Sequence, residues 1–115
     1  EKTAAPALEA GATAYGDFER FLAHPMDIVA IGSPSGLHAE QGIAAVRRGL
    51  HVLGEKPVDR TVARVDAFLA EADRARVKVG VFFQERLIPD LAGIKTLIEL
   101  GELGDPLFIS GRLDW

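Results

Sequence analysis

The chain has 115 residues, a formal net charge of -4, no cysteine and 48% hydrophobic residues, which is ordinary for one soluble domain or part of one. The lack of cysteine excludes disulfides, thiolate catalysis and cysteine-ligated zinc, and the three histidines lack metal-site spacing. The acidic balance argues against a nucleic-acid partner, because phosphate binding needs a basic face. No apolar run reaches the roughly 18 to 20 residues of a membrane span, and the first residues lack the plan of a signal peptide. We therefore expect a cytoplasmic protein that acts on a small molecule.

The first third of the chain predicts short elements that lead into one buried strand. Residues 3–10 are alanine-rich and predict a helix stub that ends at Gly11. After an extended piece at residues 12–15, Asp17 can cap a brief helix. The run DIVAIG at residues 27–32 is too short for a helix and apolar on both alternating faces. It therefore predicts a strand that is buried in a parallel sheet.

Two pairs of helix and strand follow. Residues 38–48 predict a helix that ends at Gly49, and residues 50–54 predict the second strand. The predicted buried face of this helix consists of Ala39, Ile43 and Val46. Thr61 can cap the next helix, and the run KVGVFF at residues 78–83 predicts the third strand. The predicted buried stripe of the second helix consists of Val62, Val65, Leu69 and Ala72.

The last third predicts one more helix and the beginning of another strand. Residues 90–100 predict the helix, and residues 107–115 alternate in part and predict the strand. The predicted buried face of the helix consists of Leu91, Ile94, Leu97 and Ile98. The alternation of buried strands with helices predicts right-handed βαβ units, and so an α/β fold with a doubly wound parallel sheet. Because the chain starts at Glu1 with no strand before its first helix, we expect the fold to be truncated at its front.

Three predicted loops carry polar residues directly after the strands. They are GSPSGLH at residues 32–38, GEKP at residues 54–57 and FQERL at residues 83–87. In open α/β sheets the ligand lies outside the carboxyl ends of the strands, and the topology brings all three loops to that edge. The sequence therefore predicts a small-molecule site there.

Each of these loops also has a purely structural interpretation. The run SPSG is typical of a turn, although its small residues would let a flat ligand approach the amides of a helix start. His38 can be a surface or capping histidine, or it can belong to the site. Glu55 and Lys56 can be solvated charges at a strand end. Because neighbours in a strand point to opposite faces, these two side chains would otherwise serve different partners, a diol for the carboxylate and a substrate hydroxyl for the lysine.

Four segments of the sequence together resemble a known enzyme family. They are DIVAIGSPSGLHAEQ, GLHVLGEKPV, VGVFFQERLIP and LIELGELGDPLFISGRLDW, in that order. In order and spacing they are similar to the glucose-fructose oxidoreductase, inositol dehydrogenase and MocA-like family. The resemblance implies a Rossmann domain that binds NAD or NADP, followed by an α/β domain for substrate and oligomerisation.

The resemblance also implies roles for individual residues, which match the family's motifs one by one. The nicotinamide side of the cofactor would be lined by Gly32, Ser33, Pro34 and Leu37. His38 would close that pocket, and Glu55 would bind the nicotinamide ribose. Lys56 would contact the substrate hydroxyl or the nearby cofactor and assist hydride transfer as the catalytic residue. Gln84 would meet the carboxamide and Arg86 would reach the substrate.

Two further positions bear on this resemblance. Ser35 stands where many members have asparagine, which removes one side-chain contact from the expected set. The bond between Lys56 and Pro57 is cis in several members. The resemblance therefore raises the expectation of a cis bond well above the roughly 5 to 6% found for X-Pro bonds in general.

Parts of the family pattern are missing from these residues. The sequence contains no G-x-G-x-x-G run and no candidate acid for the adenosine ribose, and the acid and histidine of the second domain are also missing. We therefore expect residues 1–104 to be a dinucleotide-binding domain without its first βαβ elements, and residues 105–115 to begin the second domain. Such a chain alone should be inactive.

The sequence thus predicts an oxidoreductase that moves a hydride between NAD or NADP and a hydroxyl-bearing carbon of a sugar, cyclitol or related polyol. Its expected partner besides this small molecule is a second copy of itself, bound through the second domain, with no nucleic acid, membrane or metal. The alternative is a regulator that senses a dinucleotide or a sugar on the same fold without catalysis. A receiver-like binding module is disfavoured, because an acidic cluster would be expected where this chain has EKP.

Overall fold

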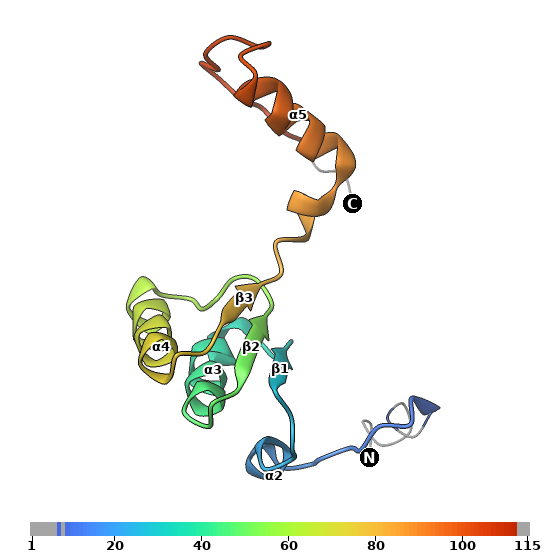
Figure 1. Ribbon diagram of the computed structural model, residues 1–115, viewed down its shortest axis with the longest axis vertical. Coiled ribbons are helices and arrows are strands. Elements are labelled where there is room, and N and C mark those ends of the chain that lie inside the picture. Colours follow the sequence, from blue (N-terminus) through green and yellow to red (C-terminus); the bar gives the residue numbers. More distant parts are fainter. Residues whose placement is uncertain (1–6, 8, 113–115) are drawn as a thin grey trace. The chain divides into compact units, whose positions relative to one another are not determined.

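The computed structural model describes residue 7 and residues 9–112, which form two compact units divided between Phe82 and Phe83 (Figure 1). Of the helix predicted at residues 3–10, Ala7 and Glu9 are helical and Ala10 lies in a turn, while residues 3–6 and 8 lie outside the described residues. Gly11 follows with φ +65°, a conformation that suits the predicted helix end.

The first unit is built on three parallel strands in the order β1-β2-β3. These strands are β1 (Ile28–Ile31), β2 (His51–Gly54) and β3 (Val79–Val81). Val52 of β2 lies between Val29 and Val79, which sets the register of the sheet. The first three predicted strands are therefore confirmed, each one to three residues shorter than expected.

The helices of this unit begin at the predicted positions, and the helix predicted at residues 38–48 ends at Val46, two residues earlier than predicted. Asp17 caps α2 (Phe18–Leu22) by accepting the N–H of Arg20 at 2.8 Å, and Thr61 caps α4 (Val62–Ala75). The 3-10 turn η1 (Ser35–Leu37) leads into α3 (His38–Val46). Gly49, with φ +78°, ends the turn that follows α3, as only glycine does without strain.

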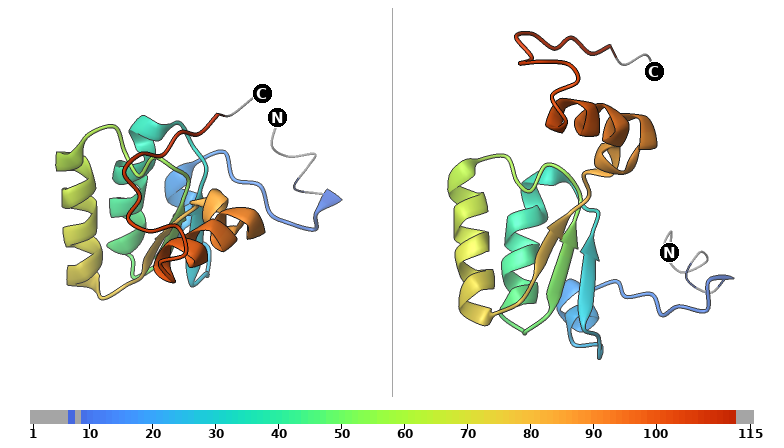
Figure 2. Two further views of the ribbon diagram at one scale, coloured as in Figure 1. Left: turned by 90° about the horizontal axis from the view of Figure 1, so that it is seen from above. Right: turned by 45° about the horizontal axis from the view of Figure 1, so that its top comes forward.

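Helices α3 and α4 pack on one face of the sheet, and this changes one prediction about β1 (Figure 2). Val29 and Ile31 point into the core, whereas Ile28 is 55% exposed and Ala30 is also exposed. The expectation that β1 is buried on both faces is therefore wrong for the described residues. The reason is geometric, since α3 and α4 cover only the face to which every second residue points.

The buried stripe of α4 agrees with the predicted one in part, since Ala72 is buried and Val65 is half-buried. Phe68 is only 3% exposed and forms the core with Ala72, whereas Val62 is 76% exposed and Leu69 is also exposed. A stripe through Leu69 and a stripe through Phe68 both fit a helical period. The larger side chain, Phe68, is the one that is buried, and it lies against Gly42 of α3. The face predicted for α3 is nearly right: Ala39 and Val46 are buried, and Ile43 is half-buried.

The second unit contains the 3-10 turn η2 (Gln84–Leu87) and α5 (Pro89–Glu99). Pro89 occupies the first turn of α5, where its missing N–H costs nothing. The prediction of a buried face is wrong for Leu91, Ile94 and Leu97, which are exposed, whereas Ile98 is half-buried. Within this unit α5 contacts η2, and Leu103 and residues 105–109 line a space beside Ile94 and Ile98, so this face is covered only in part. The predicted strand is not formed at residues 107–112, since no described strand pairs with them; residues 113–115 lie outside the described residues.

The contact between Gly42 and Phe68 gives the first testable prediction. A Cβ atom at position 42 would lie 2.6 Å from two ring carbons of Phe68, and this ring is only 3% exposed, so it cannot turn aside into solvent. Gly42→Ala should therefore lower stability by about 1 to 3 kcal/mol, despite the better helix propensity of alanine. Thermal unfolding measures the change.

The matched control is Gly93→Ala, which places the same methyl group inside α5 with nothing within 4 Å. This variant should not be destabilised. If Gly42→Ala were as stable as the control, the close packing of α3 against α4 would be contradicted.

Candidate functional site

Two of the three predicted loops come together at the carboxyl ends of the strands. The β1–α3 loop (residues 32–37) follows β1, and the β2–α4 turn (residues 55–61) follows β2. The N–H of Glu55 donates to the carbonyl of Ile31 at 2.9 Å, and the N–H of Phe82 donates to the carbonyl of Gly54 at 2.9 Å. The strand pairing therefore continues to the point where both loops begin.

The side chain of His38 contacts the backbone of both loops. Its side chain is buried, at 4% exposure, so it is neither a surface residue nor a simple cap. Its Nε2 lies 2.6 Å from the carbonyl oxygen of Ser33, and its Nδ1 lies 2.8 Å from the carbonyl oxygen of Pro57. Carbonyl oxygens only accept hydrogen bonds, and a neutral imidazole carries one N–H, with which it donates to one of these two oxygens; the other ring nitrogen lies against the second oxygen. His38 therefore connects the backbone of the β1–α3 loop with that of the β2–α4 turn.

The cavity beneath the loops is too small for a ligand. His38, Glu55 and Ile31 line a space of about 10 Å³ together with core residues of β2, β3 and α4. Such a volume holds at most one water molecule. A ligand at this edge of the sheet would therefore lie outside the loops, where Glu55 and Lys56 are exposed.

The β1–α3 loop presents small and apolar groups to solvent. Gly32, Pro34 and Leu37 are exposed, and a Cβ at position 32 would meet nothing within 4 Å. The hydroxyl of Ser33 donates to Oε1 of Gln41 at 2.6 Å, which ties the loop to α3. Small side chains at this surface leave the backbone open to close approach by another molecule.

Glu55 and Lys56 keep their charged groups apart, as expected. Oε2 of Glu55 accepts the backbone N–H of Lys56 at 3.2 Å, which leaves its other oxygen exposed. Within the part of the chain that the structure describes, no ion pair or hydrogen bond engages the ammonium group of Lys56. The Lys56–Pro57 bond is cis, in agreement with the expectation from the family resemblance. Consecutive residues at the strand end thus carry a carboxylate that can accept hydrogen bonds and an ammonium group that can donate them.

Sequence reasoning missed Asp59, whose carboxylate is fully buried. It accepts N–H groups from Ala39 at 3.1 Å and Arg60 at 2.7 Å, and it pairs with Nε of Arg64 at 2.9 Å. Burial raises the pKa of Asp59, but the N–H donors of Arg60 and Ala39 and the Arg64 guanidinium lower this pKa more, and it lies below its ordinary value. The available signal was an acid placed two residues before the helix cap Thr61, ahead of an arginine one turn into α4.

Gln84 and Arg86 belong to the second unit, which is described by itself. Gln84 begins η2, and the guanidinium carbon of Arg86 lies 5.6 Å from the ring centroid of Phe83. Their assigned contacts with the cofactor and the substrate stay predictions. The other two histidines have structural partners: His24 bonds the hydroxyl of Tyr15, and His51 accepts the N–H of Lys78. No group of three metal-binding side chains occurs among the residues that the structure describes.

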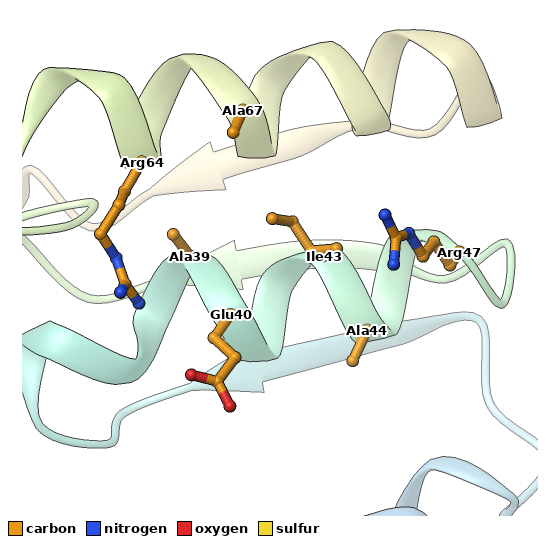
Figure 3. Close-up of a pocket in the computed structure, with 7 residues that line it drawn as sticks. All are labelled: Ala39, Glu40, Ile43, Ala44, Arg47, Arg64 and Ala67. Carbon is orange, nitrogen blue, oxygen red and sulfur yellow. The ribbon is translucent and has the colours of Figure 1, made fainter.

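A separate groove of about 390 Å³ lies between α3 and α4 (Figure 3). Its floor is formed by small and apolar side chains, and Arg47 and Arg64 stand near its two ends. Arg47 pairs with Glu71 at 3.0 Å. None of the predicted site residues lines this groove. Within the described ranges, no helix is long and apolar enough to cross a bilayer.

Comparison with known proteins identifies the family. A family model described as an oxidoreductase family with an NAD-binding Rossmann fold matches residues 1–83. The scyllo-inositol 2-dehydrogenase (NADP+) of Bacillus subtilis is 35% identical over 80 residues, which are 70% of this chain and 22% of that protein. The D-xylose 1-dehydrogenase (NADP+) 2 of Haloferax volcanii is 41% identical over 78 residues, 67% of this chain and 24% of that protein.

A solved structure agrees with these relatives. The WlbA dehydrogenase from Bordetella pertussis, in complex with NADH and UDP-GlcNAcA, matches with a TM-score of 0.82 at 32% identity. The match covers 90% of this chain and 31% of that one. The chain thus spans between about a fifth and a third of the length of these proteins. The resemblance found from the sequence motifs and the predicted parallel α/β fold class are both confirmed.

The lowered pKa of Asp59 gives a prediction about acid stability. A carboxylate whose pKa is lower in the folded than in the unfolded chain stabilises the fold above its ordinary pKa of about 3.9. This contribution disappears as the pH falls through the lower folded pKa. Asp59→Asn should therefore be less stable than the wild type at pH 7, by a margin that stays constant down to about pH 5 and narrows below pH 4. Thermal midpoints measured from pH 7 to pH 3 test this, and a margin that does not narrow would contradict it.

Proposed function

The chain belongs to the oxidoreductase family with an NAD-binding Rossmann fold, and we propose that it serves hydride exchange between NAD or NADP and a polyol. The substrate carbon carries a hydroxyl group and belongs to a sugar, a cyclitol or a related compound. Two relatives are named as dehydrogenases of an inositol and of an aldose, which supports this substrate class. The proposal covers the activity of the protein as a whole.

The observation that carries the proposal is the placement of Glu55 and Lys56. Both are exposed at the carboxyl end of β2, beside the small-residue surface of the β1–α3 loop, and His38 connects the two loops. This edge of a parallel sheet is where dinucleotides bind in such folds. The nicotinamide supplies a hydride acceptor or donor when the cofactor is bound.

The residues of this chain then have separate tasks. Glu55 would accept hydrogen bonds from the hydroxyls of the nicotinamide ribose through its exposed oxygen. The surface of Gly32, Ser33, Pro34 and Leu37 would support the flat ring, with His38 closing the pocket behind it. Because the Ser33 hydroxyl already donates to Gln41, its contact with the cofactor would use the backbone or an oxygen lone pair.

Lys56 would act at the reacting hydroxyl. Oxidation of the alcohol removes a hydride from carbon and a proton from oxygen, and both must leave together or in close sequence. As the neutral amine, Lys56 would accept the proton of the hydroxyl and become the ammonium; in the reverse direction the ammonium would return this proton to the oxygen. Gln84 would bind the carboxamide of the nicotinamide, and Arg86 would bind substrate.

The domain organisation and assembly follow from the same proposal. Residues 105–115 would begin a second domain that binds substrate and joins copies of the protein into a homo-oligomer. The protein would work in the cytoplasm. Gel filtration with light scattering of the protein expressed from its complete coding sequence tests the oligomer.

Replacement of Lys56 tests the catalytic role. In the protein expressed from its complete coding sequence, Lys56→Ala should lower kcat by about 10² to 10⁴, the usual range for loss of an acid–base group. Cofactor affinity should change much less, because Glu55 and the small-residue surface of the β1–α3 loop remain. Turnover is followed at the absorbance of the reduced nicotinamide over a panel of sugars and cyclitols.

Lys78→Ala is the matched control, since Lys78 is an exposed lysine that precedes β3 at the opposite end of the sheet. It should retain wild-type turnover. Near-normal turnover of Lys56→Ala would remove Lys56 from the mechanism, and a wild type that binds cofactor but oxidises no polyol would instead favour the non-catalytic regulator.

Replacement of Glu55 tests the cofactor contact separately. Glu55→Gln keeps one acceptor oxygen but loses the charge, and charge-assisted hydrogen bonds are about twice as strong as neutral ones. We expect NADH or NADPH to bind about tenfold more weakly, as measured by quenching of nucleotide fluorescence. Unchanged affinity for both nucleotides would show that Glu55 does not bind the ribose.

A further inference from the structure

Asp59 is a buried charge that serves neither of the predicted ligands. It follows Pro57 by two residues, its carboxylate has no exposed surface, and its three partners lie on three different elements. The Ala39 N–H belongs to the first turn of α3, the Arg60 N–H to the β2–α4 turn, and the Arg64 guanidinium to α4. The carboxylate thus holds the beginning of α3 against the turn that carries Glu55 and Lys56.

Arg64 extends this network to the other loop. Besides its contact with Asp59, its NH2 group donates to the carbonyl of Gly36 in η1 at 2.9 Å. Figure 3 shows the Arg64 side chain reaching from α4 toward the beginning of α3. Arg60 packs over the same turn, since a Cβ at Gly36 would lie 3.1 Å from its guanidinium carbon. The β1–α3 loop is therefore held from α4 as well as by His38.

We propose that Asp59 and Arg64 are positioning residues, which fix the β2–α4 turn relative to the β1–α3 loop. They would thereby place Lys56 beside the small-residue surface of that loop, where the nicotinamide would lie. This inference rests on the proposed function for its catalytic consequence. Neither residue would touch the substrate or the cofactor. They would act through the backbone of Gly36 and Ala39 on one side and through the turn after Pro57 on the other.

Loss of this hydrogen-bond network would change the position of the turn that carries Glu55 and Lys56. Asp59→Asn exchanges one acceptor oxygen for an NH2 group, while the positions around it hold only donors. At least one backbone N–H or the guanidinium then loses its partner inside the protein, which is costly. The turn must shift to relieve this, and a displacement of about 1 Å at a reacting group can cost about 10²-fold in rate.

The activity test compares Asp59→Asn with Glu71→Gln in the protein expressed from its complete coding sequence. Glu71 also connects α3 and α4, through Arg47, but at the end of α3 away from both loops. Asp59→Asn should lower kcat about tenfold or more, with a smaller change in the KM for cofactor. Glu71→Gln should retain kcat within about twofold. Equal losses in the two variants, or a kcat of Asp59→Asn within twofold of the wild type, would overturn the inference.

Hydrogen exchange measured without cofactor or substrate tests the geometry independently of activity. In Asp59→Asn, the hydrogen-bonded amides of the two loops, Leu37, Glu55 and Arg60, should exchange about tenfold faster, while those of β2 stay protected. Glu71→Gln should leave both loops unchanged. Unchanged exchange in Asp59→Asn would overturn the inference whatever the protein catalyses. A wild type that oxidises no polyol with either nucleotide would contradict the proposed function. The hydrogen-exchange result would still test whether Asp59 positions the two loops.

Arg64→Lys is the second variant for the case in which Asp59→Asn does not fold. Lysine keeps the charge but cannot reach Asp59 and the Gly36 carbonyl at once with a planar fork. We expect faster exchange at residues 33–37 and a fall in kcat smaller than that of Asp59→Asn. Wild-type exchange and wild-type kcat in Arg64→Lys would exclude the proposed network.

Discussion

The parallel register of β1, β2 and β3 is the constraint on which the candidate site depends. Because the strands run in the same direction and pair residue by residue, β1 and β2 end at the same edge. Their hydrogen bonds continue into the loops, from Glu55 to Ile31 and from Phe82 to Gly54. Residues more than 20 positions apart in sequence are thereby brought together through backbone hydrogen bonds.

Polar groups at this edge fall into a buried and an exposed layer. His38 and Asp59 are buried. The ring of His38 contacts backbone carbonyl oxygens, and the carboxylate of Asp59 binds backbone N–H groups and Arg64, so both side chains hold the loops in place. Glu55 and Lys56 are exposed, with one carboxylate oxygen and the ammonium group directed to solvent or ligand. The division is physically reasonable, because a buried charged group must satisfy its partners within the protein, while a group that meets a ligand must remain accessible.

The remaining apolar surface follows from the same architecture. Helices α3 and α4 bury one face of the sheet, so Val29 and Ile31 are in the core and Ile28 is not. In the second unit, α5 is amphipathic but has its apolar residues exposed among the described elements. A hydrophobic period therefore predicted the elements correctly in both places, but it could not say which apolar face is covered.

Much of the fold and part of the site could be predicted from the sequence. The three strands, the caps Asp17 and Thr61, and the convergence of the first two loops follow from local signals and from the rule for parallel sheets. The sequence could not predict whether Leu69 or Phe68 of α4 is buried, since stripes through either residue have the same period. The fit of the Phe68 ring against Gly42 selects Phe68. The strand predicted at residues 107–115 has suitable alternation, but a strand exists only where a neighbour pairs with its backbone.

For the site, the sequence by itself determined which groups stand at the strand ends: a loop of small residues, a carboxylate and a lysine. Only the tertiary structure decided that His38 is buried between two carbonyl oxygens and that Asp59 connects α3, α4 and the turn after β2. The physical reason is that local spacing specifies the side of an element on which a residue lies. Its hydrogen-bond partners come from other elements, and the packing of α3 against α4 and the sheet determines which of them are within reach.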